Sequence, residues 1–156
     1  MRQLDQRINL KLGDSEATIH FIEISDDKKW LRSYIDMTLP VESGDEVLRS
    51  VQKDVLVEEL YKLCEYFERH LSAHEAGSKG KMTMFTPSER LFRIFASTGS
   101  LDSDTKGMFP LRLMVNIGPA SVNRNYVYRS TDALVQVSDI RDFITSTREF
   151  LLKVTG

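Results

Sequence analysis

Two histidines on a predicted helix come closest in type and spacing to a pattern that could do chemistry. His70 and His74 are four residues apart, so on a helix their rings share a face and could bind one metal ion, with Glu75 as a third ligand. A zincin-type hydrolase also needs a glutamate directly after the first histidine as base, and Leu71 occupies that position. The spacing equally fits two partly charged imidazoles that complement the dipole at a helix C-terminus. We expect this second arrangement, with no metal and no cofactor, and keep a metal-dependent hydrolase as an alternative.

The remaining candidates for chemistry lack essential parts. Cys64 is the only cysteine and neighbours the apolar stripe of its predicted helix, where thiols are usually inert. The segment GSKGK, residues 77–81, has glycines and a lysine but follows a helix and lacks the Gly-Lys-Ser/Thr ending of a phosphate-binding loop. The serines of STGS, residues 97–100, have no Gly-x-Ser-x-Gly elbow around them. No catalytic constellation emerges, so we expect a protein that is not an enzyme.

Length and composition predict a single globular domain, residues 1–156. Of the 156 residues, 41% are hydrophobic and 28% charged, the balance of a folded chain. The net charge is -2 and lysine and arginine are scattered, so we expect no nucleic-acid partner. The N-terminal stretch alternates charged and apolar residues, and no run reaches the roughly 18 apolar residues of a membrane span, so we expect no signal peptide and no membrane partner. A lone cysteine suits a reducing compartment, and we expect the cytoplasm.

Alternation of apolar and polar residues predicts about eight strands. The clearest strand of the N-terminal half covers residues 31–39. In the strand before it, the apolar positions shift from Ile19 and Phe21 to Ile22 and Ile24, which predicts either a bulge or a strand covered on both faces. A weaker strand is expected at residues 48–53. TPSER, residues 86–90, is expected to join two strands, the second of which has Phe92, Ile94 and Ala96 on one face. A long strand at 109–117 and two short strands at 126–128 and 135–137 follow.

Helical stripes predict two principal amphipathic helices, at residues 54–70 and 139–152. Asp54 is the expected N-cap of the first helix and Ser138 that of the second. Each helix follows one group of strands. We therefore predict an α+β fold with a mostly antiparallel sheet.

Acidic residues concentrate in three predicted connecting segments. These are Asp26 with Asp27, then Glu42, Asp45 and Glu46, then Asp102 with Asp104. Acidic loops can steer a basic partner, although each can also be only a solvated turn. Tyr126 and Tyr128 would anchor an interface if they face solvent, or pack in the core.

The order of these features resembles a known family. One shared feature is an acid followed by Trp-Leu at a strand start, in DDKKWLRSYIDMTL, and another is a later strand pair around an aromatic residue and a proline, in FTPSERLFRI. In both features the chain resembles the WapI-like group of immunity proteins of bacterial polymorphic toxin and contact-dependent growth inhibition systems. The residues that carry the resemblance are Asp27, Trp30, Leu31, Phe85, Pro87 and Phe92. The group tends to have an acid directly before the proline, where this chain has Thr86.

This resemblance implies a cytoplasmic protein that binds and neutralises a cognate toxin domain without catalysis. Toxins that act on nucleic acid need positive surfaces, so we expect the contact surface to include some of Asp26, Asp27, Glu42, Asp45 and Glu46. The alternative within the binding class is an adaptor or small-ligand domain that uses a cleft between sheet and helix.

Overall fold

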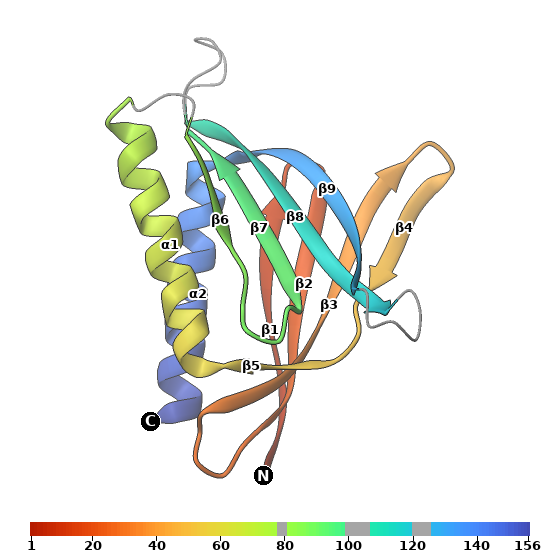
Figure 1. Cartoon of the computed structure of the whole chain (residues 1–156), viewed down its shortest axis with the longest axis vertical. Helices are drawn as coiled ribbons and strands as arrows, with labels where there is room; N and C mark the ends of the chain where they lie inside the picture. Colours follow the sequence, from red (N-terminus) through yellow and green to blue (C-terminus); the bar gives the residue numbers. More distant parts are fainter. Residues whose placement is uncertain (78–80, 99–106, 120–125) are drawn as a thin grey trace.

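The computed structural model describes residues 1–77, 81–98, 107–119 and 126–156 and has an α+β fold, as predicted. Its described part holds nine strands and two helices (Figure 1). Their bounds are β1 Arg2–Leu12, β2 Ser15–Ile24, β3 Trp30–Val41, β4 Gly44–Arg49, β5 Lys53–Leu56, α1 Val57–Glu75, β6 Met82–Phe85, β7 Phe92–Ser97, β8 Met108–Pro119, β9 Tyr126–Gln136 and α2 Val137–Thr155.

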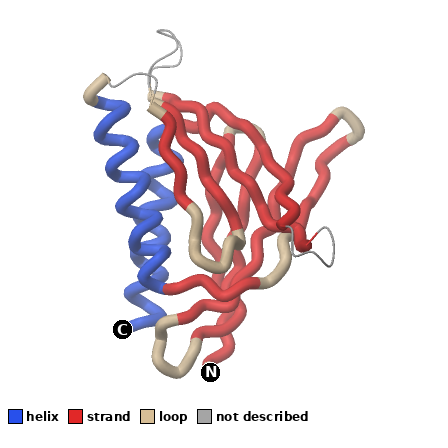
Figure 2. Tube along the Cα trace, viewed as in Figure 1, coloured by secondary structure: helices blue, strands red, loops and turns tan. Residues whose placement is uncertain are grey.

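The strands form two antiparallel sheets. In the first, the order is β1-β2-β3-β4, and β5 pairs with β3 beside β4. In the second, the order is β6-β7-β8-β9. The TPSER segment joins β6 to β7, as predicted. The two helices lie next to each other along one side of the sheets, and the β3–β4 hairpin projects on the other side (Figures 1 and 2).

The core lies between the inner faces of the two sheets and the two helices. In strands such as β1, alternation sends one set of side chains inward, and Ile8, Leu10 and Leu12 are at most 3% exposed. Residues from both sheets and both helices enclose a space of about 10 Å³, which is at the lower limit for one water molecule. The described core residues around this space are therefore closely packed.

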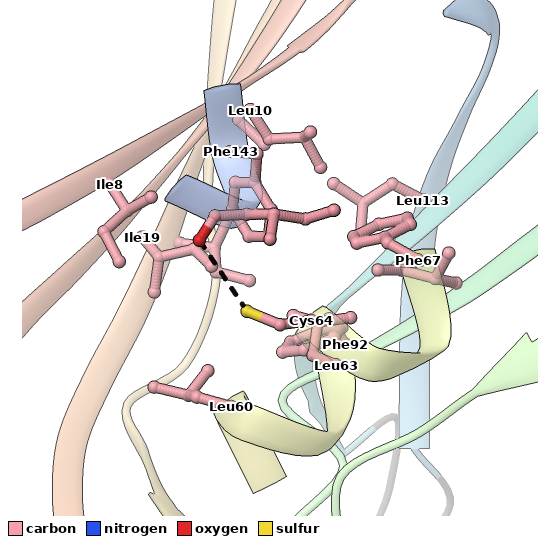
Figure 3. Packing of buried hydrophobic residues seen from close by; sticks show 14 of the residues in the cluster. Ile8, Leu10, Ile19, Leu60, Leu63, Cys64, Phe67, Phe92, Leu113 and Phe143 are labelled. Atoms are coloured by element: carbon pink, nitrogen blue, oxygen red, sulfur yellow. Dashed lines mark hydrogen bonds between the residues drawn. The ribbon is translucent and has the colours of Figure 1, made fainter. Parts of the chain in front are cut away.

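Aromatic side chains join the helices to each other and to the first sheet. Phe67 of α1 meets Phe143 of α2 edge to face, with ring centroids 5.7 Å apart. Phe150 of α2 stacks on Phe21 of β2 at 4.3 Å. Figure 3 shows this part of the core, including the contact of 4.0 Å between the Cys64 sulfur and the Ile144 carbonyl oxygen.

The helices are longer than predicted, and both predicted N-caps are wrong. Asp54 belongs to β5, opposite Arg32 of β3, and its carboxylate lies 3.4 Å from that guanidinium. The N-cap of α1 is Leu56, whose N–H donates to the Glu59 carboxylate at 3.3 Å. Ser138 lies inside α2, whose N-cap is Gln136. In both cases a strand runs directly into the helix, so the end of the sheet pairing sets the start, and at α1 the Glu59 carboxylate adds a hydrogen bond to the N-cap backbone.

Two strand predictions also need correction. The strand expected at 48–53 is two strands, β4 and β5, because the chain leaves the edge of β3 after Ser50 and the Val51 N–H donates to the Asn116 carbonyl of β8 at 3.0 Å. The short strands expected at 126–128 and 135–137 are one strand, β9, which pairs with β8 along its length. The bulge in β2 is confirmed, since the register with β3 shifts between Phe21 and Glu23. Neither described helix is long and apolar enough to cross a membrane.

The Cys64 thiol is buried, as its place beside the apolar stripe predicted. It is fully covered, and burial raises its pKa to about 11. At pH 8 only about one thiol in a thousand would be the reactive thiolate. We expect Cys64 in the folded protein to resist iodoacetamide and to react rapidly once urea unfolds the chain. Mass spectrometry of alkylated samples across a urea series checks this, and fast labelling without urea would contradict the buried position.

Candidate partner-binding surfaces

The five acidic residues predicted to bind a partner lie at opposite ends of β3. Asp26 and Asp27 are in the turn before the strand, and Glu42, Asp45 and Glu46 are in the hairpin that follows it. A strand of this length separates its ends by roughly 40 Å, at about 3.3 Å per residue. The five acids therefore do not form one continuous surface.

Asp27 has a structural role in the β2–β3 turn. Its carboxylate accepts a hydrogen bond of 2.6 Å from the Ser25 hydroxyl and one of 3.1 Å from the Lys29 N–H. The hydrogen bond from Ser25 is the main cause that lowers the pKa of Asp27. The neighbouring Asp26 carboxylate pairs with the Met1 amino group. These contacts account for both acids without a partner protein.

The other three acids belong to a projecting hairpin, here called the acidic hairpin, residues 36–49. Its turn consists of Glu42 and Ser43, followed by Gly44 at a φ of 118°, a backbone conformation that favours glycine. Glu42, Asp45 and Glu46 are exposed, and none of the three makes an ion pair within the described residues. The hairpin extends away from the rest of the molecule (Figure 1). It therefore presents uncompensated negative charge on an accessible arm.

A polar cluster fixes the base of the acidic hairpin. Arg49 of β4 donates two hydrogen bonds, of 2.8 and 3.0 Å, to Asp36 of β3, and its guanidinium lies 4.8 Å from the centre of the Tyr34 ring. The bond from Arg49 is the main cause that lowers the pKa of Asp36. His20 stacks on Tyr34 at 4.5 Å, with its Nε2 atom 3.2 Å from Asp36. These contacts hold the two strands of the arm together on the outer face of the sheet.

A second surface, the outer face of the β6–β9 sheet, combines arginine with aromatic residues. The Arg90 guanidinium lies 5.1 Å from the Tyr126 ring, and that of Arg93 lies 5.3 Å from Phe95 and 6.0 Å from Tyr128. Tyr126 is 48% exposed and Tyr128 is half-buried, so both lie outside the core. Sequence reasoning missed the arginines, although arginine and tyrosine are enriched at protein interfaces.

The two histidines share one face of α1, as their spacing predicted, but His70 lies in the core. His70 is 3% exposed and packs on the Phe109 ring at 4.4 Å, with His74 at 5.7 Å from the same ring. Burial lowers the pKa of His70, so its ring is neutral near pH 7 and does not complement the helix dipole, which corrects that prediction for His70, while His74 lies in the last turn of α1. Glu75, the suggested third metal ligand, pairs with Arg141. Among the described residues, no group of three or more His, Cys, Asp and Glu side chains could hold a metal ion.

Some of the segments considered from the sequence fall outside the described residues. These are residues 78–80 of the GSKGK segment, residues 99 and 100 of STGS, and Asp102 with Asp104. Comparison of the chain with protein-family models, with curated proteins and with solved structures gives no match.

Proposed function

We propose that this protein is an immunity protein that binds and neutralises a cognate secreted bacterial toxin domain without catalysis, and that the acidic hairpin contributes to the contact. The observation that carries the proposal is the group of three exposed carboxylates, Glu42, Asp45 and Glu46, which have no ion-pair partner in the described structure and lie on a projecting arm. A toxin that cleaves or modifies nucleic acid presents a positive surface, which such an arm can cover. Charges of this kind chiefly accelerate and steer association.

The family resemblance supports the scaffold of this proposal rather than its contact surface. Asp27 holds the turn before β3, Leu31 is fully buried, and Phe92 is buried beside Phe85 at 6.1 Å. These residues form the turn and the core, so the pattern that this chain shares with the WapI-like group at these positions favours a similar fold. The contact with a partner is instead inferred from exposed residues, among which those of the acidic hairpin carry uncompensated charge.

A toxicity assay tests the proposed function. If a gene next to this one encodes a candidate toxin, its C-terminal domain is expressed in bacteria with and without this protein, and survival is scored together with co-purification of the two chains. We expect survival only with the protein, and a stable complex. Toxicity that persists in its presence, or survival without a complex, would reject the proposal.

Charge reversal then tests the hairpin. Glu42→Lys combined with Glu46→Lys should lower the association rate roughly tenfold or more at low ionic strength and weaken its salt dependence. The matched control is Glu65→Lys combined with Glu149→Lys, which makes the same change in net charge at exposed positions of the two helices, away from the hairpin. Stopped-flow or surface plasmon resonance at protein concentrations well below the micromolar range gives the rates. Equal rates for both double variants would exclude the hairpin from the contact while leaving the toxicity result unaffected.

A further inference from the structure

The β4 strand forms an uncovered sheet edge. Among the described elements, β1 lies against α2 and β9, and β6 lies against α1, whereas β4 packs extensively only on β3. Its residues 44–47 and Arg49 are all exposed. An uncovered edge presents backbone N–H and C=O groups that can pair with another strand.

The hydrogen bonds next to β4 show which of its backbone groups are available. The Ser50 N–H donates to the Ile35 carbonyl of β3 at 2.8 Å. Successive residues of a strand direct their backbone groups to opposite sides, so Asp45, Val47 and Arg49 direct theirs away from β3. These three residues alternate with Glu46 and Leu48, and their side chains share one face of the strand.

The sequence of β4 is complementary to itself when two copies run antiparallel. If a two-fold axis passes through Val47, then Asp45 of one copy lies opposite Arg49 of the other, and the same pair repeats on the far side of the axis. The two Val47 side chains meet between these charge pairs. Opposite charges directly across an antiparallel pair stabilise it, and β-branched pairs do the same. Charges on an edge strand usually prevent pairing, but here the signs favour it.

Arg49 can serve this contact without giving up its own partner. It binds Asp36 through Nε and Nη2, and its side chain is 65% exposed. A guanidinium has five N–H donors, so the Nη1 side is open to a second carboxylate. Asp36 also holds Arg49 in place, which reduces the side-chain entropy that a new ion pair would cost.

We propose that this protein forms a two-fold symmetric dimer through antiparallel pairing of β4 with β4 of a second copy. The pairing joins two five-stranded sheets into one continuous sheet, with six backbone hydrogen bonds from Asp45, Val47 and Arg49 of the two copies. The inference concerns the free protein, so it goes beyond the proposed function and stands whether or not a toxin is the partner. Two six-residue edges bury less area than the roughly 1,600 Å² of a standard stable interface, so the dimer is weak.

Sedimentation velocity at rising protein concentration tests the dimer. The mass of the wild-type protein should rise from that of a 17.9-kDa monomer toward twice that value. Val47→Pro removes one outward N–H and breaks no bond to β3, and proline is tolerated at such edge positions, so this variant should stay monomeric. Val47→Thr keeps the N–H and the branched side chain and should associate like the wild type. A wild-type protein that stays monomeric, or a Val47→Pro variant that associates equally well, would overturn the proposal.

Reversing the charge of Asp45 gives a second, independent test of the dimer. Asp45→Arg places two arginines opposite each other on both sides of the axis and should weaken association at least tenfold. Asp26→Arg makes the same charge change at the opposite end of β3 and should have no effect. Both positions are exposed, so neither change endangers the fold, and far-UV circular dichroism verifies this for every variant. Equal association of the Asp45→Arg variant and the wild type would rule out the proposed register.

Discussion

Replacing Phe67 by alanine is expected to lower the free energy of unfolding by about 3–5 kcal/mol. Phe67 is fully buried on α1, where its ring meets Phe143 of α2 edge to face and lies 5.4 Å from the Tyr66 ring. The space enclosed by described core residues that include its contact Phe143 is only about 10 Å³, so the core around this contact is closely packed. The lost ring therefore leaves a new cavity as well as the lost burial of apolar surface.

Urea denaturation followed by far-UV circular dichroism measures this change. Leu152→Ala on α2 is the control, because Leu152 is 67% exposed and its truncation should alter stability by no more than about 0.5 kcal/mol. If the Phe67 variant lost less than about 1 kcal/mol, the helices would contribute little to the core and the packing of α1 against α2 would have to be reconsidered.

Local periodicity predicted most of the fold because burial repeats with the geometry of each element. The α1 stripe of Leu60, Leu63, Phe67 and Leu71 is buried, as are Phe92, Ile94 and Ala96 on β7. The shift of apolar positions in β2 predicted the observed bulge. In these cases the side chains that reveal the element are also the ones that form its core contacts.

Element boundaries were predicted less well because they depend on neighbours distant in the sequence. Asp54 has the residue type of an N-cap, but its pairing with Arg32 of β3 makes it part of a strand. Residues 50–52 interrupt the edge strand because Val51 bonds to Asn116 of β8, a residue far along the chain. No local pattern contains information of this kind.

For the candidate site too, the sequence predicted which residues are present but not which contacts they make. Composition alone identified the acids of both turns. Only the structure separates Asp27, whose carboxylate holds a turn, from Glu42 and Glu46, whose carboxylates have no described ion-pair partner. The opposite charges of Asp45 and Arg49 suggest pairing with a second copy only once β4 is known to be an edge strand, because a strand paired on both sides would have no open backbone groups.

Asn116 connects three parts of the fold at the base of the acidic hairpin. In β8 the alternation places it among outward-facing residues, yet it is only 1% exposed. Its side-chain amide donates to the Arg90 carbonyl at 3.0 Å, and its Oδ1 atom accepts the Gly118 N–H at 2.8 Å, which fixes the bulge of β8. Its carbonyl accepts the Val51 N–H, next to the end of β4. The Asn116 side chain thus ties the β6–β7 turn to the β8 bulge, while its backbone carbonyl holds the break in the edge strand.

Asn116→Ala should destabilise the protein by about 1–3 kcal/mol, because it leaves the buried Gly118 N–H without an acceptor, whereas the carbonyl of the exposed Arg90 can bind water instead. Asn9→Ala is the matched control, since its side chain makes one exposed hydrogen bond, of 2.9 Å, with Thr18. Urea denaturation gives the two changes, and we expect less than about 1 kcal/mol for the control. Hydrogen exchange locates the effect, because the Gly118 amide loses its acceptor and should exchange faster relative to the α1 core. Equal losses in the two variants, with unchanged exchange at Gly118, would show that the Asn116 side chain does not hold the β8 bulge in place.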